Sequence, residues 1–395
     1  MSPLRVLQVV PSMSPRDGGP TRAIATIERA LSEAGVEVTT LTTDHELKLH
    51  GGLGALAAEN GVRRIYAHKW LDPYKVAPGL VARLMQGMEG HDIVHIHALF
   101  SFASTAAAWV ARRRRVPYVV RPLGTLGGYG MRARRRQLKR VSLALVEGPI
   151  LRRAAAVHFT SQAELEEANA LGLPMRSVVI PLGVDADRGA PATPLPHRAL
   201  AGRRVILFLS RLDPKKNVEA LIDAVASSPI LSRSCALLIA GAGEPGYVAS
   251  LQARTAAAGL SDRTVWLGHV EGAQKRAAFA TADVFVLPSF SENFGIAAIE
   301  ALHAGVPCVL ARGVAIAREI DEAGAGLAVA PEAGAVALAL QRILDTDLQR
   351  SMAQHASQFA GREYSVQAMA KRLIALYEGI CSTKPDGAKC RAACP

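Results

Sequence analysis

Short apolar runs alternate with amphipathic helical patterns along both halves of the chain. Strands that are apolar at nearly every position are typical of parallel sheets covered by helices on both faces. In the first half we expect strands at Leu4–Val10, Val36–Thr42, Asp92–His97, Pro117–Arg121, Ala156–Thr160 and Val178–Pro181. In the second half we expect them at Val205–Ser210, Ala236–Ala240, Thr264–Leu267, Asp283–Leu287 and Pro307–Leu310. The pattern predicts an α/β fold with two Rossmann-like domains.

The chain is long enough for two domains, since its 395 residues can bury two cores of ordinary size. A stretch rich in Pro, Ala and Gly separates the halves and lacks apolar periodicity, which predicts a linker. The expected divisions are an N-terminal domain over 1–185, a linker over 186–203, a C-terminal domain over 204–360, a closing helix over 361–380 that packs back on the N-terminal domain, and a flexible tail over 381–395.

The apolar runs fall short of the roughly 20 residues that a membrane span requires. The first ten residues lack the charged leader and cleavage site of a signal peptide and resemble a first strand, so we expect a cytoplasmic protein. Cys235 and Cys308 fall in strand-like runs and are expected to be buried free thiols. Cys381, Cys390 and Cys394 stand in the tail without a histidine or a CxxC pair, which disfavours a zinc site.

Positive charge is concentrated in the first half of a chain whose formal net charge is +12. The residues from Ile93 to Val146 include no Asp or Glu, while Arg and Lys are dense within 111–140. Arginines beside apolar positions favour an anionic membrane surface as the partner of this segment. A solvated basic helix and a nucleic-acid-binding surface are the alternatives. Because aromatic residues are only 5% of the chain and none of the usual nucleic-acid modules occurs, we expect no nucleic acid partner.

The stretch from Val284 to Leu310 predicts a buried strand, a polar loop and a helix that opens near Phe294. Glu292 lies in the loop and Glu300 inside the helix. Measured along a helix, this spacing is about 12 Å and places both carboxylates on one face. Carboxylates that flank one glycosidic bond lie less than about 10 Å apart. The spacing therefore favours contacts with two ends of one elongated, hydroxyl-rich ligand.

Charged and glycine-rich loops follow two other predicted strands. Arg211 and Lys216 follow the first strand of the second half, and Lys215 could replace Lys216 on spacing alone. Two cations there suit a diphosphate leaving group, although a solvated loop with ordinary surface charge is the alternative. Gly18 and Gly19 precede a predicted helix, whose free N–H groups favour a phosphate, but such a pair is as often a simple turn.

Two further motifs favour structural roles. The segment Gly241-Ala242-Gly243 lacks the full GxGxxG spacing, and we expect a tight turn that lines the cleft, with no NAD. His95 and His97 point to the same side of a strand. Because no Cys, Asp or further His stands at a suitable spacing, we expect them to line a cleft or to be satisfied in the core, and we expect no metal site.

Together these residues resemble the retaining glycosyltransferases of the GT-B fold, of the family-4 type. The resemblance spans Leu4 to about Glu378 and is strongest in the E-x7-E signature formed by Glu292 and Glu300. It implies two Rossmann-like domains that face each other across a cleft, the first binding the acceptor and the second a nucleotide sugar.

The resemblance also implies roles for individual residues. Glu300 would bond the ribose hydroxyls, Glu292 the donor hexose, and the cations the donor diphosphate. The residues implied in catalysis are Arg211, Lys216 and Glu292, and those implied in donor binding are Glu300, Asn293, Phe294, Gly295, Gly18, Gly19 and Lys215.

One position departs from the family pattern. Many relatives have a His-Gly pair after the strand that we expect at Pro117–Arg121, whereas this chain has Leu123 in place of the His. Arg121 and His97 are the nearest candidates to take over its work on the acceptor side. The stretch from Arg121 to Leu126 is similar to a subset of transferases that act in exopolysaccharide and lipid-glycan synthesis.

The resemblance implies an enzyme that moves a hexose from a UDP- or GDP-linked donor to a glycan or lipid-linked acceptor in bacterial cell-surface polysaccharide synthesis. The configuration of the anomeric carbon would be retained, by displacement on the same face. No cofactor and no metal are implied, because Arg211 and Lys216 would supply the charge that Mg²⁺ otherwise provides. The implied location is cytoplasmic and peripheral at the inner face of the membrane. A GT-B enzyme that epimerises or hydrolyses nucleotide sugars, and a basic nucleic-acid-binding protein, remain alternatives.

Overall fold

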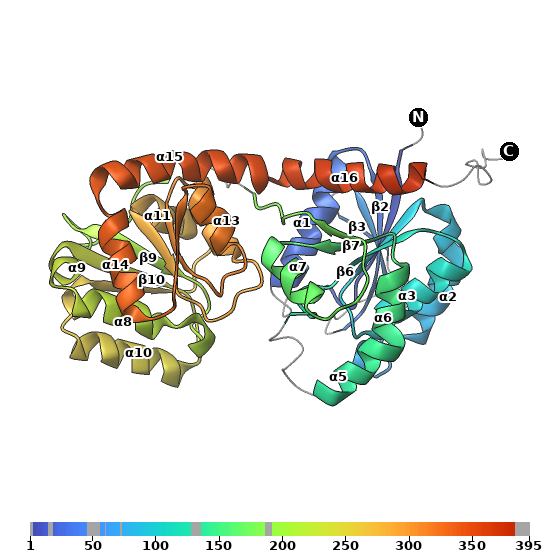
Figure 1. Cartoon of the computed structure of the whole chain (residues 1–395), viewed down its shortest axis with the longest axis horizontal. Helices are drawn as coiled ribbons and strands as arrows, with labels where there is room; N and C mark the ends of the chain where they lie inside the picture. Colours follow the sequence, from blue (N-terminus) through green and yellow to red (C-terminus); the bar gives the residue numbers. More distant parts are fainter. Residues whose placement is uncertain are drawn as a thin grey trace. The chain divides into compact units, whose positions relative to one another are not determined.

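The computed structural model describes residues 3–14, 19–45, 56–59, 61–71, 73–127, 136–185 and 192–383. The chain divides into two compact units (Figure 1). Unit 1 comprises Met1–Gly183 together with Val366–Pro395, and unit 2 comprises Val184–Ser365. Each unit has its own sheet covered by helices, so the predicted α/β class is confirmed.

Unit 1 contains an eight-stranded sheet in the order β3-β4-β2-β1-β5-β6-β7-β8. Its strands are β1 (Arg5–Val9), β2 (Glu37–Thr43), β3 (Leu56–Glu59), β4 (Val62–Ala67), β5 (Ile93–His97), β6 (Tyr118–Arg121), β7 (Ala156–Phe159) and β8 (Ser177–Val179). All neighbours pair in parallel except β3, which runs antiparallel to β4. The sequence did not predict β3 and β4, because β3 is short and the arginines at 63 and 64 interrupt the apolar pattern of β4.

The helices of unit 1 follow the predicted alternation with two differences. They are α1 (Gly19–Glu33), α2 (Pro78–Gly87), α3 (Phe102–Arg113), α5 (Arg136–Ser142), α6 (Gly148–Arg153), α7 (Gln162–Asn169) and α16 (Val366–Ser382), with short 3-10 turns at Pro73–Lys75 and Met88–Gly90. The first difference is that the sequence predicted neither α2 nor α7. The second is a π-helical segment, Leu143–Glu147, that joins α5 to α6.

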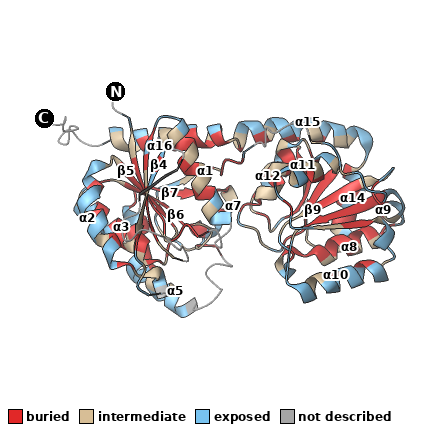
Figure 2. Cartoon of the chain, turned by 180° about the vertical axis from the view of Figure 1, so that it is seen from behind, coloured by how far each residue is buried: buried red, intermediate tan, exposed pale blue. Residues whose placement is uncertain are grey.

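The two faces of the unit 1 sheet differ in chemistry. One face is apolar and packs against α2, α3 and α6 through residues such as Leu7, Ile96 and Val120. The opposite face carries His95, whose Nδ1 lies 2.7 Å from the hydroxyl of Tyr377 on α16. Both faces are buried (Figure 2). Unit 1 therefore contains a buried layer of polar side chains between its sheet and α16.

Unit 2 contains a six-stranded parallel sheet in the order β11-β10-β9-β12-β13-β14. Its strands are β9 (Arg204–Leu209), β10 (Cys235–Ala240), β11 (Thr264–Gly268), β12 (Val284–Leu287), β13 (Cys308–Ala311) and β14 (Gly326–Val329). Its helices are α8 (Val218–Ser227), α9 (Pro229–Ser234), α10 (Pro245–Ala257), α11 (Gly272–Thr281), α12 (Ile296–His303), α13 (Ala317–Glu322), α14 (Ala333–Ile343) and α15 (Thr346–Glu363), with 3-10 turns at Pro214–Lys216 and Ser261–Arg263. The last strand and the helices α9, α13 and α15 were not predicted.

The chain passes between the units at two neighbouring points. It leaves unit 1 after Gly183 and returns after Ser365. The expected closing helix over 361–380 is therefore two pieces, since α15 ends at Glu363 in unit 2 and α16 belongs to unit 1. The described part of the expected linker, 192–203, belongs to unit 2, where the backbone N–H of Leu195 donates to Thr281.

The remaining predictions about the chain as a whole concern cysteines and membrane spans. Cys235 and Cys308 are buried free thiols, as predicted, and Cys381 lies near the end of α16. Cys390 and Cys394 lie outside the described residues. Among the described helices, none combines the length and apolar character needed to cross a membrane.

Candidate active site

The strand order of unit 2 reverses between β9 and β12, which are hydrogen-bonded neighbours. In parallel α/β sheets, ligands bind where the order reverses, beyond the carboxyl ends of the two strands. The loops that follow β9 and β12 contain the charged residues that the sequence analysis identified. This strand pair therefore defines the candidate site.

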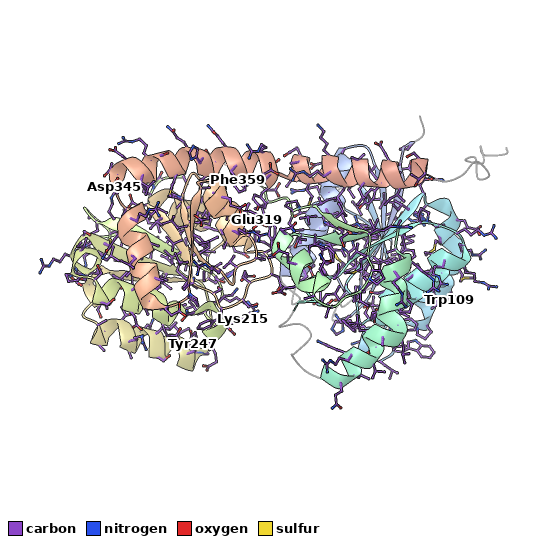
Figure 3. The ribbon with its side chains drawn as sticks, in the orientation of Figure 1. Trp109, Lys215, Tyr247, Glu319, Asp345 and Phe359 are labelled. Carbon is purple, nitrogen blue, oxygen red and sulfur yellow. The ribbon has the colours of Figure 1, made fainter. Side chains whose placement is uncertain are left out.

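The loop after β9 is fixed by its own turn and by the loop after β10. Asp213 caps the 3-10 turn Pro214–Lys216 by accepting from the backbone N–H of Lys215. A Cβ at Gly241, whose φ is 145°, would lie 1.8 Å from the carbonyl oxygen of Ser210. Only glycine permits this approach, and Gly243 pairs with Leu212 through a parallel bridge, so the two loops lie side by side. Lys215 is labelled in Figure 3.

Asn217 connects the loop after β9 to its neighbours. It adopts the left-handed conformation, with φ 56°, directly before α8. Its side-chain amide donates to the carbonyl oxygens of Pro288 and Pro331, the first of which directly follows β12. No sequence pattern indicated this role, which depends on two prolines distant along the chain.

The loop after β12 places Glu292 outside the following helix. Glu292 pairs with the segment around Val314 through backbone hydrogen bonds to Gly313 and Ala315. Gly295 has a φ of 90°, which the interior of a right-handed helix does not allow, and α12 begins at Ile296. The prediction that the helix opens near Phe294 was wrong by two residues. The helical spacing of about 12 Å therefore does not apply to Glu292 and Glu300.

The structure brings Lys216 and Glu292 together. The ammonium group of Lys216 contacts Oε2 of Glu292, and both side chains are largely buried. This ion pair joins the loop after β9 to the loop after β12 across the point where the strand order reverses. Arg211 follows the same strand but is exposed and pairs with no carboxylate of the described chain.

Glu300 has a cationic partner of its own. It lies on α12 in a half-buried position, and its Oε1 lies 2.7 Å from Nζ of Lys275 on α11. The sequence analysis missed Lys275, because a single lysine on a polar helix carries no signal. A carboxylate on so apolar a helix requires such a partner when it is withdrawn from water.

The start of α12 offers hydrogen-bond donors beside Glu292. Within the described residues, no acceptor meets the backbone N–H groups of Asn293, Phe294 and Gly295. Free N–H groups that precede a helix attract anions. The ring of Phe294 is buried and packs edge-on against Tyr364, with ring centroids 5.8 Å apart. The carboxylate, the cation and the donors thus form one polar site in unit 2.

The predicted residues of unit 1 belong to a separate set. Gly19 is the first residue of α1, and Gly18 lies outside the described residues. His97 and Arg121 are direct partners on the adjacent strands β5 and β6, and both are buried. Leu123 has a φ of 58°, a left-handed conformation that is uncommon for a residue other than glycine.

No group of three or more His, Cys, Asp and Glu side chains in the described part of the chain is arranged to hold a metal ion. The buried ring of His95 packs against those of His97 and His158 and bonds to the hydroxyl of Tyr377. His97 also bonds to Gln8, and His158 to the carbonyl oxygen of Ile180. Burial and the nearby Arg121 hold the pKa values of His95 and His97 well below the usual value. Both imidazoles are therefore neutral at pH 7.

Two families of known proteins match the two halves of the chain. Residues 18–183 match the glycosyl transferase 4-like domain, and residues 196–360 match the glycosyl transferases group 1. The phosphatidyl-myo-inositol mannosyltransferase of Mycobacterium leprae (strain TN) is 33% identical over 210 residues, which cover 52% of this chain and 54% of that protein. The match thus spans about half the length of that relative.

A second relative and a solved structure match over more of the chain. The GDP-mannose:cellobiosyl-diphosphopolyprenol alpha-mannosyltransferase of Komagataeibacter xylinus is 26% identical over 340 residues, covering 83% of this chain and 81% of that protein. The structure of HepE from Anabaena in complex with UDP has a TM-score of 0.73 at 21% identity, covering 95% of this chain and all of that one. At this identity the likeness shows the fold alone, which is of the GT-B type.

Proposed function

The chain belongs to the glycosyl transferases group 1, joined to a glycosyl transferase 4-like domain, and from this premise we propose that it transfers a hexose from a nucleotide sugar to a glycan or lipid-linked acceptor. The observation that carries the proposal is the pair of Lys216 and Glu292, held together where the strand order of unit 2 reverses. A cation for a phosphate and a carboxylate for sugar hydroxyls stand side by side there, next to free N–H groups.

The pair suggests how the donor binds. In the structure Glu292 neutralises Lys216. A donor diphosphate would replace Glu292 as the partner of Lys216, and Glu292 would then accept hydrogen bonds from the hexose hydroxyls. Arg211, which is exposed at the same strand end, would turn onto the diphosphate. Glu300, held at one oxygen by Lys275, would offer its other oxygen to the ribose hydroxyls.

The chemistry of the step follows from these placements. Charge grows on the leaving diphosphate as its bond to the anomeric carbon breaks, and Lys216, Arg211 and the N–H groups of 293–295 would stabilise it. We propose that the departing phosphate oxygen takes the proton of the acceptor hydroxyl, which attacks from the same face, so that the anomeric configuration is retained. This scheme uses neither a cofactor nor a metal ion.

The donor is proposed to be a UDP- or GDP-linked hexose. The name of the Komagataeibacter xylinus relative includes GDP-mannose and a polyprenol-linked acceptor, and HepE was solved with UDP. These names support a nucleotide-sugar donor and a lipid-linked glycan acceptor, as in cell-surface polysaccharide synthesis.

A ligand screen tests the proposal directly. Purified protein is heated with UDP- or GDP-linked hexoses, and the Tm is recorded. A ligand at about 100 times its Kd stabilises the folded protein by about 2.7 kcal/mol. Glu300→Gln should lose the response, whereas Glu322→Gln, at an exposed carboxylate of unit 2, should keep it. Stabilisation by none of the sugars, or equal stabilisation of both variants, would refute the site. The one-bond C1–H1 coupling of the transferred hexose, measured by NMR, reports retention or inversion.

We also propose that unit 1 binds an anionic membrane surface through the basic segment 111–140 and the helix that follows. Leu138, Val141, Leu145 and Val146 are exposed, and their spacing places them on one side of a helix. Lys139 and Arg140 stand among them on α5. Residues 128–135 lie outside the described residues. An exposed apolar stripe beside cations is typical of helices that lie in the membrane interface.

Vesicle binding tests this surface with a matched control. Leu145 is 73% exposed in unit 1, and Leu338 is 69% exposed on α14 of unit 2. Leu145→Ser should reduce sedimentation with phosphatidylglycerol vesicles, whereas Leu338→Ser should not. Binding should weaken as salt rises, because salt screens the attraction of cations to the lipid headgroups. Equal binding by all three proteins would contradict the assignment. A shift of duplex DNA that competes with vesicles would favour the nucleic-acid alternative.

A further inference from the structure

Arg121 is a buried cation without a counter-ion. It ends β6, its exposed fraction is 2%, and its Nε and Nη1 have no hydrogen-bond partner among the described residues. Glu164 attracts it electrostatically, but the carboxylate of Glu164 is occupied by the backbone N–H groups of Gly124 and Thr160 and the hydroxyl of Thr160. A buried charge without a partner is strongly unfavourable, so the chain retains at this position a cost that a bound anion would remove.

The neighbouring histidines do not provide the missing acceptor, because they bond to one another. His158 donates from Nε2 to the carbonyl oxygen of Ile180 at 2.8 Å, which leaves its Nδ1 to accept from Nε2 of His95 at 3.4 Å. Nδ1 of His95 then accepts from the hydroxyl of Tyr377 at 2.7 Å. This relay uses every nitrogen of both rings. It anchors α16 to the sheet and leaves Arg121 unpaired.

Among the described residues, His97 and Gln8 each have one buried nitrogen without a hydrogen-bond partner. His97 Nε2 lies 3.1 Å from Oε1 of Gln8, so the imidazole donates there and its Nδ1 keeps a lone pair. That Nδ1 and Nε2 of Gln8 are both buried and have no partner among the described residues. His97 is the direct partner of Arg121 across β5 and β6. Adjacent strands lie about 4.8 Å apart, so these side chains are neighbours on one face.

Gln8, His97 and Arg121 lie near the carboxyl ends of their strands, where ligands bind in parallel α/β sheets. The strand order of unit 1 reverses between β1 and β5, which carry Gln8 and His97. The loops beyond the strand ends hold Ala98, Phe100 and Leu123 in the left-handed conformation, and all three residues are half-buried. Strained residues of this kind cluster at ligand sites. The orphaned groups therefore lie at the unit 1 counterpart of the position that Lys216 and Glu292 occupy in unit 2.

We propose that Arg121, His97 and Gln8 form a binding site for an oxyanion on a hydroxylated ring, namely a sugar phosphate or a hexuronate, and that this anion belongs to the acceptor. Arg121 would donate two hydrogen bonds to the oxyanion, His97 Nδ1 would accept from a ring hydroxyl, and the amide of Gln8 would donate to another oxygen. Only the assignment to the acceptor rests on the proposed function. The presence of an oxyanion site does not.

The test measures anion binding without any transfer reaction. The Tm of the full chain is recorded with inorganic phosphate, glucose 6-phosphate, glucuronate and neutral glucose, against sodium chloride of equal ionic strength. We expect the sugar anions to raise the Tm more than inorganic phosphate does, and glucose to have no effect. A larger response to glucose 6-phosphate identifies a phosphate as the acceptor anion, and a larger response to glucuronate identifies a carboxylate. No response above chloride, or an equal response to glucose, overturns the proposal.

Two variants locate the site. Arg121→Met should abolish the anion response and, because it removes an unpaired buried charge, should be no less stable than the unliganded wild type. Arg83→Met, at an exposed arginine on α2 of the same unit, should keep the response. If Arg121→Met does not fold, Arg121→Lys should fold and bind the sugar anions more weakly. An unchanged response in the Arg121 variants, or equal loss in Arg83→Met, overturns the proposal. Anion binding by a protein that transfers no hexose would refute the proposed function and leave this site standing.

Discussion

Replacing Lys216 by Ala separates the two roles that this lysine has in the structure. It is the cation of the candidate donor site, and it also neutralises Glu292. The exposed fractions of the two side chains are 11% and 23%, so water provides little screening of either charge. The variant should therefore lose activity and some stability, by amounts that can be worked out separately.

Loss of one group that stabilises developing charge costs about 10²–10³ in kcat, or about 2.7–4 kcal/mol of transition-state stabilisation. Loss of a hydrogen bond between charged groups costs about 1.5–3 kcal/mol of folding free energy. Because Glu292 keeps some contact with water, the lower end of the second range applies. If the two residues act as a pair, Glu292→Gln combined with Lys216→Ala should cost less than the sum of the single changes, by about 1–3 kcal/mol.

The assay is hexose transfer at saturating donor, with denaturant unfolding of the same four proteins as the second measurement. Arg233→Ala is the matched control, since it removes an exposed cation of unit 2 from α9 and should change kcat by less than about threefold. Near-wild-type turnover of Lys216→Ala would refute the assignment of the diphosphate cation. Additive losses in the double variant would show that the pair has no functional coupling.

Three further changes have outcomes that the structure determines. Lys275→Met removes the ammonium group 2.7 Å from Glu300, so the Kd for the donor, measured by titration, should rise about tenfold with little change in kcat. Burial raises the pKa of Glu147 to about 7, whereas the unfolded carboxyl releases its proton near 4.5. Wild-type stability should therefore fall as pH rises through this window, by up to about 3 kcal/mol, and Glu147→Gln should remove that fall in denaturant titrations at pH 5 and pH 8. Tyr377→Phe leaves Nδ1 of the buried His95 without a donor and should cost about 1–3 kcal/mol in the unfolding of unit 1, measured by hydrogen exchange; an unchanged exchange rate would contradict the relay.

The fold followed from the sequence wherever local pattern decided the structure. The buried strands β9, β10 and β12 consist of apolar runs, and their positions were predicted to within one or two residues. The strand β4 was missed because charged side chains interrupt its pattern, and its place in the sheet depends on pairing with β2. The start of α12 was missed because Gly295 adopts a left-handed conformation that a periodic pattern does not reveal.

The residues of the candidate site were likewise predicted only where local pattern was sufficient. Lys216, Glu292 and Glu300 stand in motifs with a recognisable spacing, and the sequence was sufficient to select them. Lys275 is recognisable only because folding carries α11 next to α12, a contact between segments that are separate in sequence. Motif spacing reports what one loop can offer to a ligand. It does not report which charges on other elements hold that loop in place.

The buried polar layer of unit 1 depends most strongly on distant segments of the chain. His95 and His158 come from β5 and β7, and Tyr377 comes from α16, 282 residues beyond His95. Without α16 the relay would lose its first donor, and the polar face of the sheet would lose its cover. The core of unit 1 is therefore complete only after α16 has folded onto the sheet. The same layer explains why Arg121 stands out, since it is the cation that the completed relay leaves without a partner.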